Sequence, residues 1–128
     1  MLHENITKKI IEAYYKVYNS LGNGFLEKVY ENALMIGLKR SNLKVDQQKN
    51  VKVFYNWFEV GDYYADLMVE DLVIVELKAA ESLCEEHEAQ LINYQKATNL
   101  EVVLLLNFGK KAEFKRKVFS NVRKSVFY

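Results

Sequence analysis

Apolar residues recur at two different spacings along this chain, and each change of spacing marks another predicted element. Over residues 5–20 and about 26–40 the apolar side chains return every three or four positions, which is the period of an amphipathic α-helix. Leu21-Gly22-Asn23-Gly24 interrupts this pattern, and glycine commonly ends a helix. The first third of the chain is therefore predicted to form two helices joined by a glycine-rich turn.

Beyond Leu43 the period shortens to two, which is the alternation of a half-buried β-strand. A first strand is predicted to reach Tyr55, with Asn56-Trp57 at the tip of a hairpin and the return starting at Phe58. Gly61-Asp62 is expected to form a bend or a bulge before the next strand pair. The middle of the chain is thus predicted to consist of consecutive strands.

The remaining residues return to a helix and then to strands. Residues 79–88 pass from a loop into a helix that extends to about Thr98, and residues 101–108 are almost continuously apolar, as in a strand covered on both faces. Residues 114–118 alternate like an edge strand, and residues 119–128 are predicted to form a short helix. The order of helices, three strands, helix and strand indicates one α/β domain over residues 1–128, with a mixed central sheet flanked by helices.

Charged residues interrupt the two apolar strands between Tyr63 and Lys78, which are joined near Glu70-Asp71. The charged side chains are Asp66, Glu76 and Lys78 itself, and charges are rare in such strands unless they are paired or hold a metal. Glu76 and Lys78 share one face of their strand because side chains alternate. This pair of strands is therefore the predicted centre of the molecule's chemistry.

Whether Asp66 joins that face depends on the register of the hairpin. A three-residue connection from Glu70 to Leu72 would place Asp66 opposite Glu76. A two-residue turn would place Asp66 opposite Val75, and the two acids would then lie on different faces. A shared acidic site therefore requires the longer connection or a β-bulge.

Composition and charge narrow the class of protein. The 128 residues are 50% apolar and 27% charged, which is ordinary for a globular domain, and the net charge of +1 gives no overall field that would indicate a nucleic-acid partner. The lone Cys84 excludes an internal disulfide and is consistent with a reducing compartment. The N-terminus lacks the regions of a signal peptide, and no apolar run is long enough to cross a bilayer. We therefore expect a cytoplasmic protein without a membrane partner.

Four short motifs occur in a fixed order along the chain. They are Gly24-Phe25-Leu26-Glu27-Lys28-Val29-Tyr30, which has the form G-x-x-E-x-x-Y, followed by Ala65-Asp66, Glu76-Leu77-Lys78 and Gln90-Leu91-Ile92-Asn93-Tyr94. Together with Leu106-Asn107-Phe108-Gly109, they make the chain resemble the GxxExxY family of the PD-(D/E)XK nuclease superfamily, from Leu21 to about Lys117. Ala65 stands where the superfamily name has proline. The resemblance implies a restriction-endonuclease-like core of helix, three-stranded meander, helix and strand.

The resemblance also implies a site for a divalent metal, Mg²⁺ or Mn²⁺, on the central hairpin. Asp66 and Glu76 would be its carboxylate ligands and the backbone carbonyl of Leu77 a further one, and these hard oxygen donors suit either ion. Lys78 would orient or activate the attacking water and stabilise a negative transition state. Glu27 would be an additional acidic group, or a first-turn acid favoured by the helix dipole. The alternative for Glu76 and Lys78 is a solvated cross-strand ion pair.

Further candidates for substrate contact lie toward the C-terminus. Gln90 and Tyr94 match a Q-x-x-x-Y signature whose residues, by resemblance, support the site and contact substrate, and their spacing places both on one helix face. A buried Tyr94 with a satisfied hydroxyl is the alternative. The side chain of His87 either points to the same side of the helix as that of Gln90, or His87 is a polar residue at the helix start. Lys115 and Arg116 belong to a basic stretch, which could bind phosphate groups of a nucleic acid or form a solvated face.

The leading hypothesis is a metal-dependent nuclease that hydrolyses phosphodiester bonds in nucleic acid, with DNA as the expected substrate. The alternative is the same fold without turnover, as a nucleic-acid-binding or protein-interaction module. A purely structural domain would leave the charges of the central strands unexplained. Trp57 at the hairpin tip is a candidate for stacking on a base, or it packs against the turn. Because the domain is small, we expect low sequence specificity, or a homodimer or partner protein that supplies targeting.

Overall fold

Helices and strands lie where the spacing of apolar residues predicts them. The computed structural model describes residues 3–96 and 98–118. The elements in chain order are α1 (Glu4–Leu21), α2 (Glu27–Arg40), β1 (Val45–Tyr55), β2 (Phe58–Val69), β3 (Val73–Lys78), α3 (Glu85–Lys96), β4 (Val102–Phe108) and β5 (Ala112–Val118). The short helix predicted at 119–128 falls outside the described residues.

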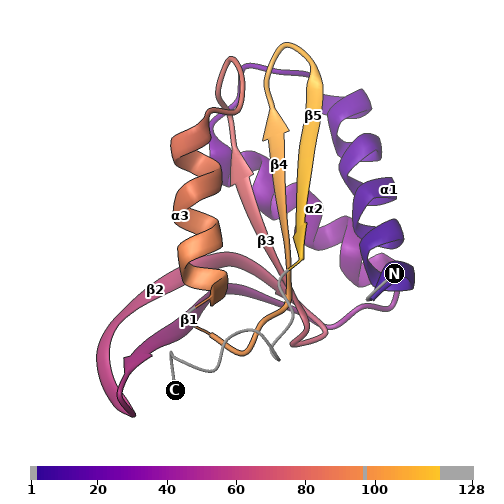
Figure 1. Ribbon diagram of the computed structural model, residues 1–128. Coiled ribbons are helices and arrows are strands. Elements are labelled where there is room, and N and C mark those ends of the chain that lie inside the picture. The colour runs from indigo at the N-terminus through magenta and orange to yellow at the C-terminus, as the bar shows by residue number, and fades with distance from the viewer. Residues whose placement is uncertain (1–2, 97, 119–128) are drawn as a thin grey trace.

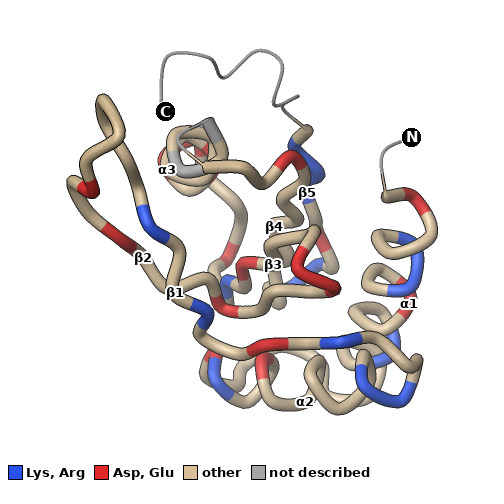
Figure 2. The backbone as a smooth tube through the Cα atoms, turned by 90° about the horizontal axis from the view of Figure 1, so that it is seen from below, with Lys and Arg blue, Asp and Glu red and all other residues tan. Residues whose placement is uncertain are grey.

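In the described part of the chain, the strands form one mixed sheet in the order β1-β2-β3-β4-β5. Neighbouring strands are antiparallel except β3 and β4, which run parallel and are connected through α3. Helices α1 and α2 cover one face of the sheet, and α3 covers the other (Figures 1 and 2). The predicted α/β fold of restriction-endonuclease type is confirmed. None of the described helices is long and apolar enough to span a membrane.

The two faces of the sheet carry separate cores. Under α1 and α2 lies the larger one, to which α1 contributes a buried stripe at helical spacing that includes Ile10, Tyr14 and Val17. The smaller core lies under α3. Leu104 belongs to the first core and Leu105 to the second, which explains why the sequence of β4 is apolar without alternation.

The register of the β2–β3 hairpin is the one that the acidic site requires. Leu67 pairs with Val75 and Val69 pairs with Val73, so residues 70–72 form a three-residue connection. Val75 packs into the core under α1 and α2, whereas Ile74 packs under α3. Glu76, two residues after Ile74, therefore shares the α3 face, as predicted from the alternation along β3.

The strand β2 differs slightly from its predicted course. It continues through Gly61 and Asp62 without a break, and the irregularity lies one residue earlier. Phe54 pairs with Glu59 and Val53 pairs with Gly61, so the residue between Glu59 and Gly61 is the extra residue of a β-bulge. A bulge bends and twists the strand that carries it, and the hairpin of β1 and β2 curves strongly (Figure 1).

Part of the G-x-x-E-x-x-Y motif serves the fold. Gly22 and Gly24 have positive φ values of 67° and 112°, which glycine adopts without strain. The hydroxyl of Tyr30 donates to the carbonyl oxygen of Gly22 at 2.6 Å and accepts from the backbone N–H of Phe25 at 3.2 Å. The ring of Tyr30 stacks on Phe108, with 4.2 Å between the ring centroids. Tyr30 therefore fixes the turn before α2 and packs α2 against the end of β4.

Candidate active site

A cavity of about 210 Å³ lies between β3, β2 and α3. Its lining residues are Tyr63, Tyr64, Glu76, Lys78, His87, Gln90 and Leu91. Four of these are residues that the sequence singled out: Glu76 and Lys78 from β3, and His87 and Gln90 from α3. The parallel crossover places α3 over β3, which brings together side chains from two separate elements.

Asp66 lies where β2 separates from β3. The paired residues of these two strands begin at Leu67 and Val75, and on the far side of Asp66 the strand β2 follows β1 away from the sheet (Figure 1). The Oδ2 atom of Asp66 accepts a hydrogen bond from the backbone N–H of Leu77 at 2.8 Å. The carboxylate therefore takes the place of the backbone acceptor that β2 would otherwise supply, and it is anchored next to Glu76.

The backbone N–H and carbonyl groups of Leu77 face the gap between β2 and β3 in which Asp66 lies. In an extended strand the N–H and C=O of one residue point toward the same neighbouring strand. Because the N–H of Leu77 donates to Asp66, its carbonyl oxygen also lies on the side of β3 that faces β2. Two oxygen-bearing groups, the carboxylate of Asp66 and the carbonyl of Leu77, thus flank the gap between the strands.

Glu76 has a carboxylate oxygen without a hydrogen-bond partner. Its Oε1 atom is buried, and no donor from the described residues reaches it. Burial, followed by the nearby charge of Asp66, raises the pKa of Glu76 from 4.5 to about 9, while the charge of Lys78 acts in the opposite direction. A buried acceptor of this kind costs free energy unless a donor or a cation meets it.

The donor set fits a divalent cation such as Mg²⁺ or Mn²⁺. Two carboxylates and a backbone carbonyl are hard oxygen ligands, and a cation would provide both the missing partner of Glu76 and the positive charge that two close acids require. No three Asp, Glu, His or Cys side chains form a metal-binding group in the portion of the chain that is described. The candidate centre is therefore built on the pair Asp66 and Glu76, together with Leu77.

Glu31 is connected to this site, although sequence reasoning gave it no role. The side-chain amide of Gln48 donates to Asp66 Oδ1 at 3.2 Å and to Glu31 Oε1 at 2.9 Å. Glu31 is only 4% exposed, and its other oxygen pairs with Lys28 at 2.7 Å. Gln48 has a φ of 51°, an uncommon value for this residue type, and such backbone positions cluster at functional sites. A buried acid on α2 thus helps to hold Asp66 through one glutamine.

Glu27, the helix acid that the sequence places at the site, is an exposed residue at the start of α2. Among the described residues, the side-chain partners of Asp66 do not include Glu27, and the connection from α2 comes from Glu31, one turn further on. The sequence contains a signal for the role of Glu31. Glu31 falls on the same helical stripe as the buried Leu34 and Leu38, where an acid needs a partner.

His87 serves the start of α3 and also lines the cavity. Its Nδ1 atom accepts a hydrogen bond from the backbone N–H of Cys84 at 3.4 Å. A neutral imidazole that accepts through Nδ1 carries its proton on Nε2. Gln90, one turn later, is exposed at the cavity wall. The side chain of Tyr94 lies outside the described part of the structure.

Lys115 and Arg116 lie away from the cavity, on the edge strand β5, which β4 separates from β3. Arg116 is opposite Leu104 and Lys115 is opposite Leu105, so their side chains point to opposite faces of the sheet. Only Lys115 shares the face covered by α3, and neither residue lines the cavity. The structure therefore does not gather this basic pair on one surface.

The backbone that follows Lys78 is held by Asn107, a buried residue of β4. The side chain of Asn107 accepts from the N–H of Ala80 and donates to its carbonyl oxygen, both at 3.0 Å. Asn107 also lies beside Lys78 in the parallel ladder. The Leu106-Asn107-Phe108-Gly109 motif thus fixes the position at which β3 ends and the cavity wall begins.

Gly109→Ala is expected to destabilise the folded protein by about 1–3 kcal/mol, because the added methyl would collide with the carbonyl oxygen of Ala80. Urea denaturation measures this difference in unfolding free energy. Gly61→Ala is the control, since a Cβ at Gly61 meets no atom within 4 Å. Equal stabilities for the two variants would contradict the close approach of these two segments.

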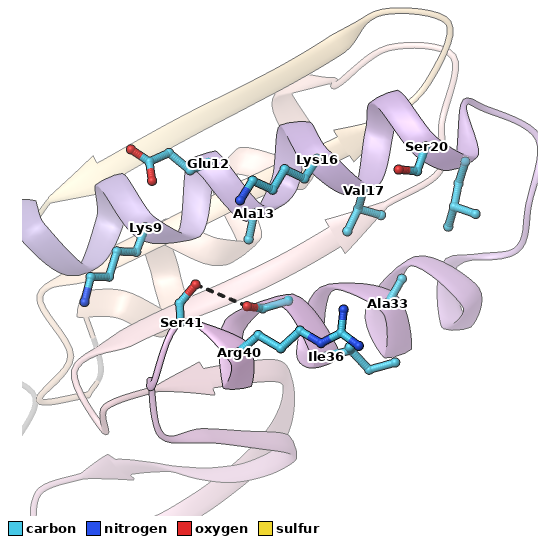
Figure 3. A pocket seen from close by; sticks show the side chains of 12 residues that line it. Lys9, Glu12, Ala13, Lys16, Val17, Ser20, Ala33, Ile36, Arg40 and Ser41 are labelled. Carbon is cyan, nitrogen blue, oxygen red and sulfur yellow. Dashed lines mark hydrogen bonds between the residues drawn. The ribbon is translucent and has the colours of Figure 1, made fainter.

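A larger hollow, of about 470 Å³, lies between α1 and α2 (Figure 3). Ala13, Val17 and Ala33 contribute apolar side chains to it, and Lys16 and Arg40 are among the polar residues around it. None of the residues proposed for chemistry lines this hollow. We assign the candidate site to the smaller cavity, because that cavity contains the carboxylate with a strongly raised pKa.

Comparison with known proteins bears on the family and the fold. The sequence profile of the PD-(D/E)XK nuclease superfamily matches residues 4–117. Among solved structures, the chain is similar to the protein in "Crystal structure of SSO0001", with a TM-score of 0.55 and 14% identity over 78% of this chain. The match covers 53% of that protein, so this chain spans about half its length, and the likeness concerns the fold alone. No curated protein gives a significant match.

Proposed function

Because this chain belongs to the PD-(D/E)XK nuclease superfamily, we propose that it is a metal-dependent phosphodiesterase that cleaves nucleic acid, with DNA as its substrate. Within the superfamily we place it in the GxxExxY family, on the motif that begins at Gly24. One observation carries the proposal. A buried, unpartnered oxygen of Glu76 lies beside Asp66 and Lys78 at the wall of a cavity.

The residues of the candidate active site have separate proposed roles in binding the metal and the substrate. Asp66, Glu76 and the carbonyl of Leu77 would hold Mg²⁺ or Mn²⁺, with Gln48 and Glu31 orienting Asp66. The bound ion would supply Lewis-acid stabilisation of charge on the phosphoryl group and would lower the pKa of water. The side chains of the site would hold the ion and surround the scissile phosphate.

The cavity side chains would act on the phosphate and the attacking water. The ammonium of Lys78, which lines the cavity, would stabilise the growing negative charge of the transition state and donate a hydrogen bond to the nucleophile. Gln90 would donate its amide hydrogens to a phosphate oxygen, and His87 would offer the proton on Nε2. These donors offset the repulsion between the acidic pair and an anionic substrate.

A domain that binds nucleic acid or a protein without cleaving it is the competing proposal. It is favoured by the observation that, in the described residues, the site rests on a pair of acids and not on a larger acidic group. Against it, a domain that has lost catalysis should also have lost at least one polar group of the site. Asp66, Glu76, Lys78 and Gln90 are all present.

Metal titration tests the site without requiring a known substrate. Calorimetric titration of the metal-free protein with MgCl₂ or MnCl₂ should show saturable binding, and Asp66→Asn should weaken it by at least about 10-fold. Asp62→Asn is the matched control, because Asp62 lies on the same strand and accepts a hydrogen bond from Asn50 of β1 at 2.7 Å. Identical titrations for the wild type and Asp66→Asn would remove the proposed centre.

A further inference from the structure

We propose that the hairpin of β1 and β2 is a base-stacking arm that guides a single-stranded stretch of nucleic acid into the cavity of Glu76 and Lys78. This inference rests on the proposed nuclease function and specifies its substrate class. The aromatic arm consists of residues 49–65 of this hairpin.

The aromatic arm extends beyond the rest of the sheet. Its backbone pairs run from Lys49–Ala65 to Tyr55–Phe58 and belong to β1 and β2 alone, because β2 has no paired residue on β3 beyond Leu67. The arm curves away from the sheet on the side where α3 lies (Figure 1). Beyond its base, where Val51 and Ala65 join the core under α3, the arm is therefore not paired with another strand of the sheet and can contact a long ligand.

Large apolar side chains are exposed along the arm. Tyr55 is 62%, Trp57 77%, Phe58 74%, Val60 61% and Tyr64 59% exposed. Tyr55 and Phe58 face each other across the two strands. Exposed apolar surface concentrated in one element marks an interaction site, and four of these five side chains are aromatic rings. Flat rings of this kind can stack on any base, whatever the sequence.

The arm is continuous with the candidate active site. Tyr63 and Tyr64 belong to the arm and also line the cavity that contains Glu76 and Lys78. Asp66 follows directly after the arm on the same strand. A strand of nucleic acid stacked along the arm would therefore be delivered to the groups that are proposed to cleave it.

The charged residues of the arm, Lys49, Lys52, Glu59 and Asp62, all lie outside its tip. Lys52 pairs with Glu59 at 2.8 Å, and Asn50 donates to Asp62 at 2.7 Å. The tip, residues 53–58, carries no charged residue (Figure 2). The tip therefore offers stacking surface without phosphate neutralisation, which favours unpaired bases over a duplex, whose base faces are already stacked on each other and whose exterior is phosphate.

The test is fluorescence anisotropy with a labelled single-stranded oligodeoxynucleotide of about 15 nucleotides. Binding is measured in a Glu76→Gln background, so that neither cleavage nor a metal is needed. Tyr55→Ser and Phe58→Ser should each weaken binding about 10-fold, because each removes one stacking partner. The slope of log affinity against log salt concentration should stay unchanged, since no phosphate contact is lost.

Val60→Ser is the matched control, because it removes a comparably exposed side chain from the same arm without removing a ring. Its effect should be under about 2-fold if stacking, and not apolar area, is the source of affinity. Phe58→Trp should retain binding, since it keeps a ring. Thermal unfolding of all variants should match the background protein, because the replaced side chains are exposed.

The possible outcomes separate this inference from the proposed function. Unchanged binding in Tyr55→Ser and Phe58→Ser, or no binding of the single strand by the parent variant, would overturn the arm whether or not the protein is a nuclease. Sedimentation that shows a dimer, converted to a monomer by Phe58→Ser, would overturn it in favour of self-association. Weaker binding of the single strand in Tyr55→Ser and Phe58→Ser, but not in Val60→Ser, would support base stacking on the arm, even if the wild type cleaved no nucleic acid.

Discussion

Lys78→Ala and Glu76→Ala are each expected to leave a folded protein whose Mg²⁺- or Mn²⁺-dependent cleavage of DNA is at least about 100-fold slower than that of the wild type. Lys78→Ala removes the cation that would stabilise the transition state, and Glu76→Ala removes a ligand of the proposed ion. Both residues line the cavity, and neither belongs to the two apolar cores. Cleavage of a labelled oligonucleotide and circular dichroism measure activity and folding side by side.

Lys16→Ala is the matched control for the loss of a positive charge. Lys16 lines the hollow between α1 and α2, away from the proposed site, and its removal should leave cleavage unchanged. Wild-type rates in both Lys78→Ala and Glu76→Ala would remove the proposed mechanism. A rate lost in the two cavity variants and retained in Lys16→Ala would locate the chemistry at the end of β3.

Glu76→Gln is expected to stabilise the metal-free protein at about pH 8 by on the order of 1–3 kcal/mol, because the folded wild type must keep Glu76 protonated at a pH at which the unfolded chain releases the proton. The amide keeps the shape of the carboxyl group without its charge, and Asp66 beside it can accept a hydrogen bond from the new NH₂. The variant should at the same time lose metal binding, so that stability and function change in opposite directions.

The pH dependence follows from the raised pKa. The unfolded chain releases the proton of Glu76 near the ordinary pKa of 4.5, whereas the metal-free folded protein holds it until the pKa of about 9. Between these values the folded state binds more protons, so its stability falls as pH rises. The advantage of Glu76→Gln should therefore be absent below the lower pKa and grow through this range.

Urea denaturation in EDTA, carried out across this pH range, measures the effect. Glu12→Gln, at an exposed position on α1, is the control for the loss of one negative charge. Added Mg²⁺ should stabilise the wild type and leave Glu76→Gln unchanged, because only the wild type keeps both carboxylates. A wild-type stability that does not decline from acid to alkaline pH would contradict the burial of an ionisable Glu76.

The spacing of apolar residues determined the elements and their order, because burial on one face of a helix or strand imposes a period that is visible in the sequence. It also limited the hairpin to two registers, and the three-residue connection at 70–72 proved to be the one that places Asp66 and Glu76 on one face. The residue types of Asp66, Glu76 and Lys78 set the chemistry to be expected, since charges within apolar strands need a partner.

Tertiary structure decided which distant side chains meet. Glu31 is linked to Asp66 through Gln48 because α2 packs over the sheet, and no spacing within one element encodes a link among residues of α2, β1 and β2. The opposite directions of Lys115 and Arg116 follow from the pairing of β5 with β4. The separation of β2 from β3 at Asp66 likewise depends on strand pairing, and it opens the gap in which the acids lie. The sequence by itself supplied the elements and the candidate groups, whereas packing between elements selected which of those groups share a cavity.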